Sequence, residues 1–169
     1  MQPEPSRTPL EQEQANLITH RFTLNGHQDG IRKLTWSRDG QRLASAGDDC
    51  RVCIWDTINN TQLHEVKHRD RIATLAWSDD GRFIASGGHD GRVRICDSHT
   101  GEELRILVGH AGPVRSIAFD PFGKYLATAS ADTSIRLWEI DSGWCSTNGG
   151  GSTYYTTASP SPRTASMWR

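Results

Sequence analysis

A histidine followed 28 positions later by a closing residue is the feature of this sequence that most constrains its fold. The spacing occurs three times, and the pairs are His27 with Trp55, His68 with Cys96, and His110 with Trp138. The three histidines lie 41 and 42 positions apart. A fixed period in this range is typical of a repeat architecture, in which each repeat packs its apolar side chains against its neighbours. The sequence therefore predicts three copies of one structural unit.

Each copy is predicted to contain short strands joined by tight turns. In the first copy, apolar side chains recur over residues 31–36, and Asp39-Gly40 follows as a turn because these residues accept the positive φ of a tight hairpin. Residues 43–46 and 52–55 form two further strands, and residues 63–66 a weaker fourth. The same order returns at 72–77, 83–86, 93–96 and 104–108, and again at 114–119, 125–128 and 135–138.

The two ends of the chain differ in composition from the repeats. Residues 1–16 are polar and rich in Pro, Gln and Glu, which predicts a disordered lead-in. A short run over residues 17–25, with Phe22 and Leu24, indicates one strand. The pattern stops after Asp141, where a further strand was due, and residues 142–169 form a low-complexity tail of Ser, Thr, Gly and Pro. Such a tail buries too little apolar surface to offset the entropy of ordering, so it is predicted to be disordered.

Charge and composition argue against several classes of protein. The net charge is −1, which does not favour nucleic acid or a membrane surface as a general partner. The longest apolar runs are only a few residues, and the first residues lack the apolar core of a secretory signal. The four cysteines share no common position in the repeats, so a disulfide scaffold is not expected. These features favour an intracellular protein, cytoplasmic or nuclear.

A Gly-His opening and a Trp-Asp closing, at a period of about 40 residues, resemble the repeats of the WD-repeat β-propeller family. The resemblance covers residues 17–141, with units at about 20–56, 61–97 and 104–139. It implies an all-β fold, a partial β-propeller of three four-stranded blades that leaves an incomplete ring. An open arc exposes blade edges at both ends, so self-association through these edges is one expectation.

The resemblance also implies a structural tetrad in each unit, in which a His, a Ser or Thr, an Asp and a Trp are joined by hydrogen bonds. The first and third tetrads are His27, Ser45, Asp49 and Trp55, and His110, Thr128, Asp132 and Trp138. The second unit supplies His68, Ser86 and Asp90, but Cys96 replaces the Trp. A thiol is a weak donor and lacks the bulk of an indole. The second blade is therefore expected to be the least rigid.

Two groupings of residues look like catalytic or metal sites. Each unit holds Ser or Thr, His and Asp, as a hydrolytic triad would, but one active centre would not be repeated at a fixed spacing. No Gly-x-Ser-x-Gly elbow accompanies them. Cys50 and Cys53 have the spacing of a zinc ligand pair, yet the sequence holds no second pair. No catalytic, cofactor-binding or metal-binding residue is therefore predicted, and no cofactor.

The expected function is a non-catalytic protein–protein interaction scaffold or adaptor, by analogy with the family. In that family, residues beside the tetrads on the top face contact partners, and here these are Arg32, Asp48, Arg71, His89 and Arg115. Because Arg binds carboxylates in a bidentate manner, proteins or acidic peptides are the expected partners. One alternative is a truncated or alternatively terminated fragment of a longer WD-repeat protein, without independent activity. A nucleic-acid-associated adaptor and an enzyme are less favoured alternatives.

Overall fold

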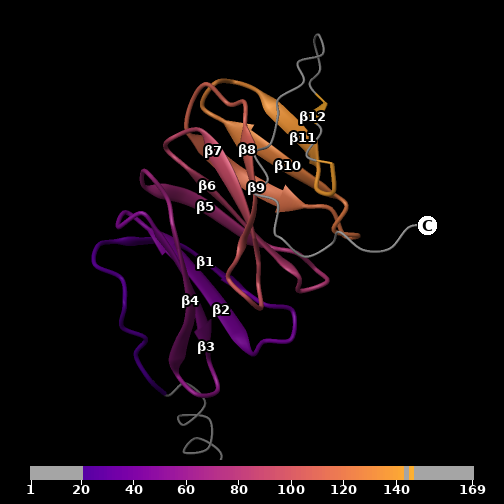
Figure 1. Cartoon of the computed structure of the whole chain (residues 1–169). Coiled ribbons are helices and arrows are strands. Elements are labelled where there is room, and N and C mark those ends of the chain that lie inside the picture. Colours follow the sequence, from indigo (N-terminus) through magenta and orange to yellow (C-terminus); the bar gives the residue numbers. More distant parts are fainter. Residues whose placement is uncertain (1–20, 143–144, 147–169) are drawn as a thin grey trace, which may run out of the picture.

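The protein is a row of three small β-sheets. The computed structural model describes residues 21–142 and 145–146, and these residues form strands and turns but no helix. The strands make three four-stranded antiparallel sheets, here called blades 1, 2 and 3 (Figure 1). This architecture confirms the all-β fold of three four-stranded blades that the sequence predicts. Since the described part has no helix, it contains none that is long and apolar enough to cross a membrane.

Within each blade, consecutive strands pair as an antiparallel meander. Blade 1 contains β1 (Ile31–Trp36), β2 (Arg42–Gly47), β3 (Arg51–Asp56) and β4 (Thr61–Lys67). Blade 2 contains β5 (Ile72–Trp77), β6 (Phe83–Gly88), β7 (Arg92–Asp97) and β8 (Glu103–Val108). Blade 3 contains β9 (Val114–Phe119), β10 (Tyr125–Ser130), β11 (Ile135–Glu139) and β12 (Cys145–Ser146). In Figure 1, blade 2 lies between the indigo and purple blade 1 and the orange blade 3.

The first hairpin of every blade turns at a glycine with positive φ. Gly40, Gly81 and Gly123 have φ values of 69°, 76° and 67°. Glycine adopts this region without the steric cost that a Cβ would bring. In blades 1 and 2, the aspartate before the glycine also accepts a hydrogen bond of 2.6 Å from the serine that directly follows the first strand. The predicted Asp-Gly turns thus lie at these positions.

Apolar side chains between the blades hold the row together. Side chains from the second and third strands of one blade pack against the first strand of the next blade. The two cores include Val52, Ile54, Ile72 and Leu75 between blades 1 and 2, and Val93, Ile95, Val114 and Ile117 between blades 2 and 3. Full burial of each such side chain stabilises the fold by about 1.5–3 kcal/mol. Blade 2 therefore packs against a neighbour on both sides, whereas blades 1 and 3 pack against one each; that blade 2 is the least rigid stays a prediction.

Two predictions about the strands are wrong. Residues 21–25 form no strand, and residues 17–20 lie outside the described part. In a unit of this kind that segment would pair with a blade preceding blade 1, and the described residues contain no such blade. Conversely, a strand does follow Asp141, because β12 pairs with Leu137 and Trp138 of β11 and completes blade 3. The disorder predicted for residues 1–16 and for the tail beyond β12 falls outside the described residues.

Candidate functional site

A chain of side-chain hydrogen bonds runs through blade 1. Trp55 Nε1–H donates to Ser45 Oγ at 2.7 Å, and the Ser45 hydroxyl donates to His27 Nε2 at 2.6 Å. His27 Nδ1–H then donates to Asp49 Oδ2 at 2.8 Å. Because an indole can only donate and an ionised carboxylate can only accept, this is the direction of the chain for the His27 tautomer that carries its proton on Nδ1. The four residues of the first tetrad thereby tie the segment before β1 to β2, β3 and the turn between these strands.

Blade 3 contains the same arrangement. Trp138 Nε1–H donates to Thr128 Oγ1 at 2.9 Å, and the Thr128 hydroxyl donates to His110 Nε2 at 2.8 Å. His110 Nδ1–H donates to Asp132 Oδ2 at 2.8 Å. Burial acts to raise the pKa of Asp132, but hydrogen bonds from Ser134 and His110 outweigh burial and hold this pKa well below its usual range. The tetrad therefore ends on a firmly ionised carboxylate.

The tetrad of blade 2 is incomplete in two ways. Ser86 donates to His68 Nε2 at 2.7 Å, but His68 Nδ1 and Asp90 Oδ2 are buried with no hydrogen-bond partner in the described part of the chain. Burial, followed by the positive charge of Arg94, lowers the pKa of His68 to about 3. The replacement of Trp by Cys96 thus accompanies a second defect, the loss of the His–Asp hydrogen bond. The sequence did not predict this second loss.

The residue before the tetrad histidine is a glycine in the two units whose tetrad contains Trp. In blade 1, a Cβ added to Gly26 would lie 2.7 Å from Trp55 Cη2, which is a steric clash. Gly109 holds the same position in blade 3, where the indole would lie 3.2 Å from such a Cβ. In blade 2 the position holds Lys67, and the smaller Cys96 side chain stands where the indole would be. Glycine thus occurs in the two units whose tetrads contain Trp, although Arg136 Nη1, at 2.5 Å, is the atom nearest to a Cβ at Gly109.

Substitution of this glycine tests that relation. Gly26→Ala is expected to lower the free energy of unfolding by roughly 1 kcal/mol or more, because the new methyl group overlaps the Trp55 ring. Lys67→Ala at the matched position of blade 2 is the control. It removes only an exposed ion pair with Glu65 at 3.4 Å, so we expect a change within about 0.5 kcal/mol. Equal shifts of the two urea midpoints would contradict the relation.

The tetrad hydroxyls of Ser45 and Thr128 and the Cys53 thiol are buried. Ser45 and Thr128 are 2% and 1% exposed, and each oxygen accepts from an indole while the hydroxyl donates to a histidine. A nucleophile instead needs access to a substrate atom. Burial raises the pKa of the Cys53 thiol to about 12, so it stays protonated. Among the residues that the structure describes, no group of three or more His, Cys, Asp or Glu could hold a metal ion.

A cavity of about 320 Å³ opens where the first strands of the three blades begin. It is lined by Arg32, Asp48, Arg71, Ile72, Ala73, His89 and Arg115, and we call it the arginine pocket. The structure brings together in this pocket all five residues that the sequence predicted to contact a partner. The two apolar lining residues, Ile72 and Ala73, were not predicted. Their only sequence signal was their position directly after Arg71, at the start of a strand.

The cations of the arginine pocket differ in their partners. Arg32 Nη2 and Nε lie 2.6 and 2.7 Å from Asp48 Oδ2, and the hydrogen bond from Arg32 lowers the pKa of Asp48. This pair is therefore neutral as a whole. Arg71 and Arg115 are exposed, and their guanidinium groups make no hydrogen bond or ion pair within residues 21–142. The pocket thus presents two guanidinium groups that lack a hydrogen-bonded counter-ion, although the charge of Arg71 acts with that of Arg32 to lower the pKa of Asp48.

Backbone hydrogen bonds and the tetrads fix the turns that carry the pocket residues. Asp48 N–H donates to the Gly30 carbonyl at 2.8 Å, and His89 N–H donates to the Arg71 carbonyl at 2.9 Å. These bonds hold the turns after β2 and β6 against the starts of β1 and β5. In blade 1, the tetrad residue Asp49 follows Asp48 directly and anchors the turn further. The pocket side chains are therefore carried by rigid elements, as a preformed binding site requires.

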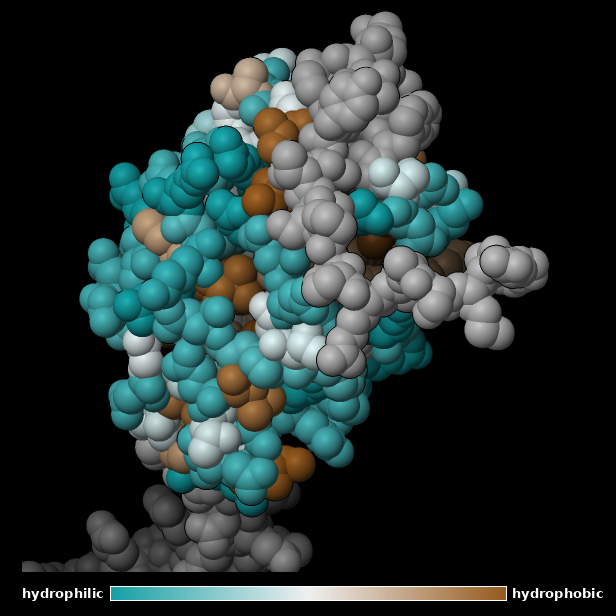
Figure 2. Space-filling view, viewed as in Figure 1, coloured by the Kyte–Doolittle hydropathy of each residue, from teal (hydrophilic) through white to brown (hydrophobic). Residues whose placement is uncertain are grey.

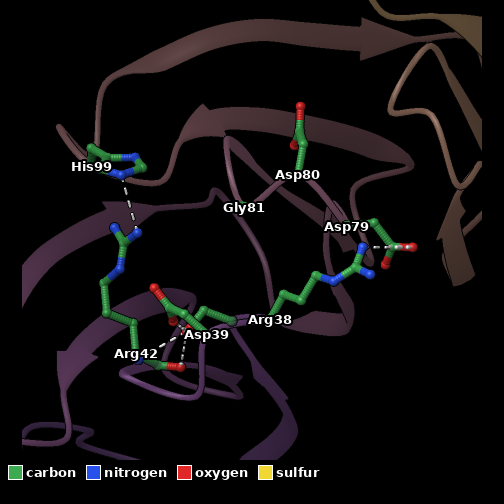
Figure 3. A pocket seen from close by; sticks show the side chains of 8 residues that line it. Arg38, Asp39, Arg42, Asp79, Asp80, Gly81 and His99 are labelled. Carbon is green, nitrogen blue, oxygen red and sulfur yellow. Dashed lines mark hydrogen bonds and ion pairs between the residues drawn. The ribbon is translucent and has the colours of Figure 1, made fainter.

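Another cavity, of about 340 Å³, lies at the opposite end of the strands, at the seam between blades 1 and 2 (Figure 3). It is lined by Ser37, Arg38, Asp39, Arg42, Asp79, Asp80, Gly81 and His99. Arg42 donates to the Ser98 carbonyl at 2.9 Å and lies 3.2 Å from His99 Nε2, and Arg38 reaches to within 3.9 Å of Asp79. Figure 3 shows both arginines extending from blade 1 toward blade 2. These groups serve to join the two blades.

Comparison with known proteins places the chain in a family. A family model described as "WD domain, G-beta repeat" matches residues 18–56, 60–97 and 101–139. The chain belongs to the WD40 repeat family. A crystal structure of the RRP9 WD40 repeats matches 79% of this chain and 40% of that chain, with a TM-score of 0.69 and 26% sequence identity. The WD40 blades described above therefore have the arrangement found in solved WD40 domains.

Two kinds of curated protein are similar to this chain. Eukaryotic translation initiation factor 3 subunit I of Neurospora crassa is 36% identical over 120 residues, which are 71% of this chain and 23% of that protein. Protein HIR1 of Mycosarcoma maydis is 34% identical over 115 residues, 68% of this chain and 7% of that protein. The chain thus spans less than a quarter of the length of these relatives. WD40 repeats are typical of protein-interaction scaffolds.

Proposed function

We propose that this chain is a non-catalytic adaptor that binds an acidic segment of a partner protein in the arginine pocket. The observation that carries the proposal is the placement of two guanidinium groups without a partner, Arg71 and Arg115, in one preformed cavity of about 320 Å³. WD40 membership supports a protein-binding role, and the charge of the pocket selects the chemistry of the partner.

The geometry of the pocket favours carboxylates as ligands. A guanidinium group presents donors in a planar fork that matches the two oxygens of a carboxylate. Arg71 and Arg115 come from blades 2 and 3, so an extended acidic segment could contact both. Of the two apolar lining residues, Ile72 is fully buried in the core, so the half-buried Ala73 is the one that a ligand could contact beside the charges. Two acidic side chains separated by a small residue would suit this arrangement.

A binding experiment tests the proposal. The probe is a short fluorescein-labelled peptide of alternating Glu and Gly, titrated with the full chain and followed by fluorescence anisotropy. The double variant Arg71→Glu, Arg115→Glu is expected to bind at least roughly tenfold more weakly. A hydrogen bond to a charged group contributes about 1.5–3 kcal/mol, and about 1.4 kcal/mol corresponds to a factor of ten.

The matched control is Arg38→Glu, which changes the same kind of side chain at the opposite end of the strands, where Arg38 is 74% exposed in its side chain. We expect this variant to bind the peptide as the unaltered chain does. An equal loss of peptide affinity in both variants would contradict the proposal. Absence of peptide binding by the unaltered chain would also contradict it, and is the result that the fragment alternative predicts. Stronger binding of a single-stranded oligonucleotide, with steep salt dependence, would favour the nucleic-acid alternative.

We further propose an intracellular location, either cytoplasmic or nuclear. The three cysteines of the described part, Cys50, Cys53 and Cys96, are free thiols, which suits a reducing compartment. Fusion of the full chain to a fluorescent protein and microscopy of expressing cells would test this location, and secretion of the fusion into the medium would contradict it.

A further inference from the structure

The first strand of blade 1 exposes apolar side chains that the other blades bury. In β5 the side chains of Ile72, Leu75 and Trp77 are 0%, 3% and 9% exposed because they pack on blade 1. The matching residues of β1 are Ile31, Leu34 and Trp36, which are 51%, 55% and 57% exposed. The residue types are the same at all three positions. Blade 1 therefore carries a formed but uncovered half of an inter-blade interface, which we call the β1 face.

The opposite end of the arc exposes the other half. In blades 1 and 2 the third strand packs against the next blade through Val52 with Ile54 and through Val93 with Ile95, all at most 2% exposed. The matching residues of β11 are Ile135 and Leu137, which are 74% and 44% exposed. We call this surface the β11 face. By contrast, the side of the molecule seen in Figure 2 is mostly hydrophilic, with hydrophobic residues in small separate patches.

The chain itself shows what fits these two faces. Twice within the arc, a face of the β11 type packs on a face of the β1 type, between blades 1 and 2 and between blades 2 and 3. A chain with one uncovered face of each type is therefore complementary to another copy of itself. Such a contact joins two different surfaces and closes into a ring if the rotation allows it. Two copies of three blades give six, within the range of four to eight blades seen in closed propellers.

We propose that two copies of this chain assemble head to tail, with the β1 face of each copy packed on the β11 face of the other, into a closed ring of six blades. The two contacts repeat the packing already present between blades within the chain. In this assembly Leu34, Trp36, Ile135 and Leu137 become buried. The proposal is independent of the arginine pocket, because neither the β1 face (Ile31, Leu34, Trp36) nor the β11 face (Ile135, Leu137) contains a residue that lines that pocket.

Light scattering after size-exclusion chromatography tests the assembly with the full chain of residues 1–169 over a wide range of concentrations. We expect a mass that rises to two copies and then stays constant. Leu34→Asp alters only the β1 face, and Leu137→Asp alters only the β11 face. Both side chains are exposed in the single chain, so neither change should unfold it, and thermal unfolding followed by circular dichroism verifies this. Each variant alone is expected to stay monomeric.

An equimolar mixture of the two variants is the decisive sample. The Leu34→Asp copy keeps an intact β11 face and the Leu137→Asp copy keeps an intact β1 face, so one contact can form and the mixture should contain a dimer. Phe122→Asp, in a turn at 89% exposure, is the control that should dimerise normally. A dimer of either single variant would indicate like-with-like pairing and overturn the proposal. Growth beyond two copies would also overturn the proposal. So would a monomer at all concentrations, which would mean that residues 147–169 or blades of a longer chain cover the two faces.

Discussion

Replacement of Trp138 by Ala is expected to lower the free energy of unfolding by about 3–5 kcal/mol. The Trp138 side chain is 1% exposed and packs in the core between blades 2 and 3. Its Nε1–H also donates to Thr128 Oγ1 at 2.9 Å, and this hydrogen bond starts the tetrad chain that ends at Asp132. The substitution therefore creates a large cavity and removes a buried donor from Thr128 at the same time.

Cys96→Ala is the matched control for this prediction, because Cys96 holds the position of Trp138 in the preceding blade. Cys96 is also buried, but its thiol makes no hydrogen bond to Ser86, so we expect a loss of only about 1 kcal/mol. Trp138→Phe should fall between the two, since it keeps much of the packing but loses a hydrogen bond worth about 1 kcal/mol. Urea unfolding with unchanged m-values measures all three. A Cys96→Ala loss as large as that of Trp138→Ala would refute the assignment of the tetrads.

Acidification from pH 7 to pH 5 is expected to destabilise the protein by about 2 kcal/mol through His68 alone. The ordinary pKa of this histidine is 6.5, and burial in the folded protein lowers its pKa to about 3. Between these values the unfolded chain binds a proton that the folded chain excludes. Stability from this group is therefore fully present above pH 6.5 and falls as the pH drops toward 3. Asp48, Asp49 and Asp132 have lowered pKa values and so contribute only in more acidic solution.

The variant His68→Gln isolates this contribution. Glutamine can still accept a hydrogen bond from Ser86 but does not titrate, so the stability of the variant should change much less between pH 7 and pH 5. A lower starting stability of the variant does not affect the test, because the test compares how steeply stability changes with pH. His99→Gln, an exposed histidine, should keep the slope of the unaltered chain. If His68→Gln keeps that slope as well, then His68 is not the buried neutral group that the structure places there.

The sequence predicted the blades well because their signals are local. Asp39-Gly40 and Asp80-Gly81 are turn signals that need no knowledge of distant residues, and the structure has turns there with Gly40 and Gly81 at positive φ. The grouping of Arg32, Arg71 and Arg115 was also accessible, since equivalent positions of successive repeats must lie near one another. A pattern that repeats at a fixed spacing therefore predicts which residues of successive repeats lie together in space.

Other features depend on neighbours that a residue pattern does not reveal. Trp36 and Trp77 follow the same local pattern, yet one is 57% exposed and the other 9%, because only Trp77 has a blade to pack against. Blade 2 offered His68 and Asp90 at the tetrad spacing, but the structure does not join them. The sequence shows Lys67 where the other two units have glycine. The reason for this difference depends on how closely the indole approaches the backbone of the matching glycine in those units. Such steric relations require coordinates.

Nuclear magnetic resonance of the arginine pocket is the most direct test of the proposed adaptor function. Two-dimensional ¹H–¹⁵N spectra of the full chain would be recorded as the Glu-Gly peptide is added, with attention to the side-chain Nε–H signals of Arg71 and Arg115. The predicted result is that shift changes concentrate on these two signals and on the amides of Asp48, Ala73 and His89. Changes centred instead on the turns between β1 and β2 and between β5 and β6, at the opposite end of the strands, would contradict the account.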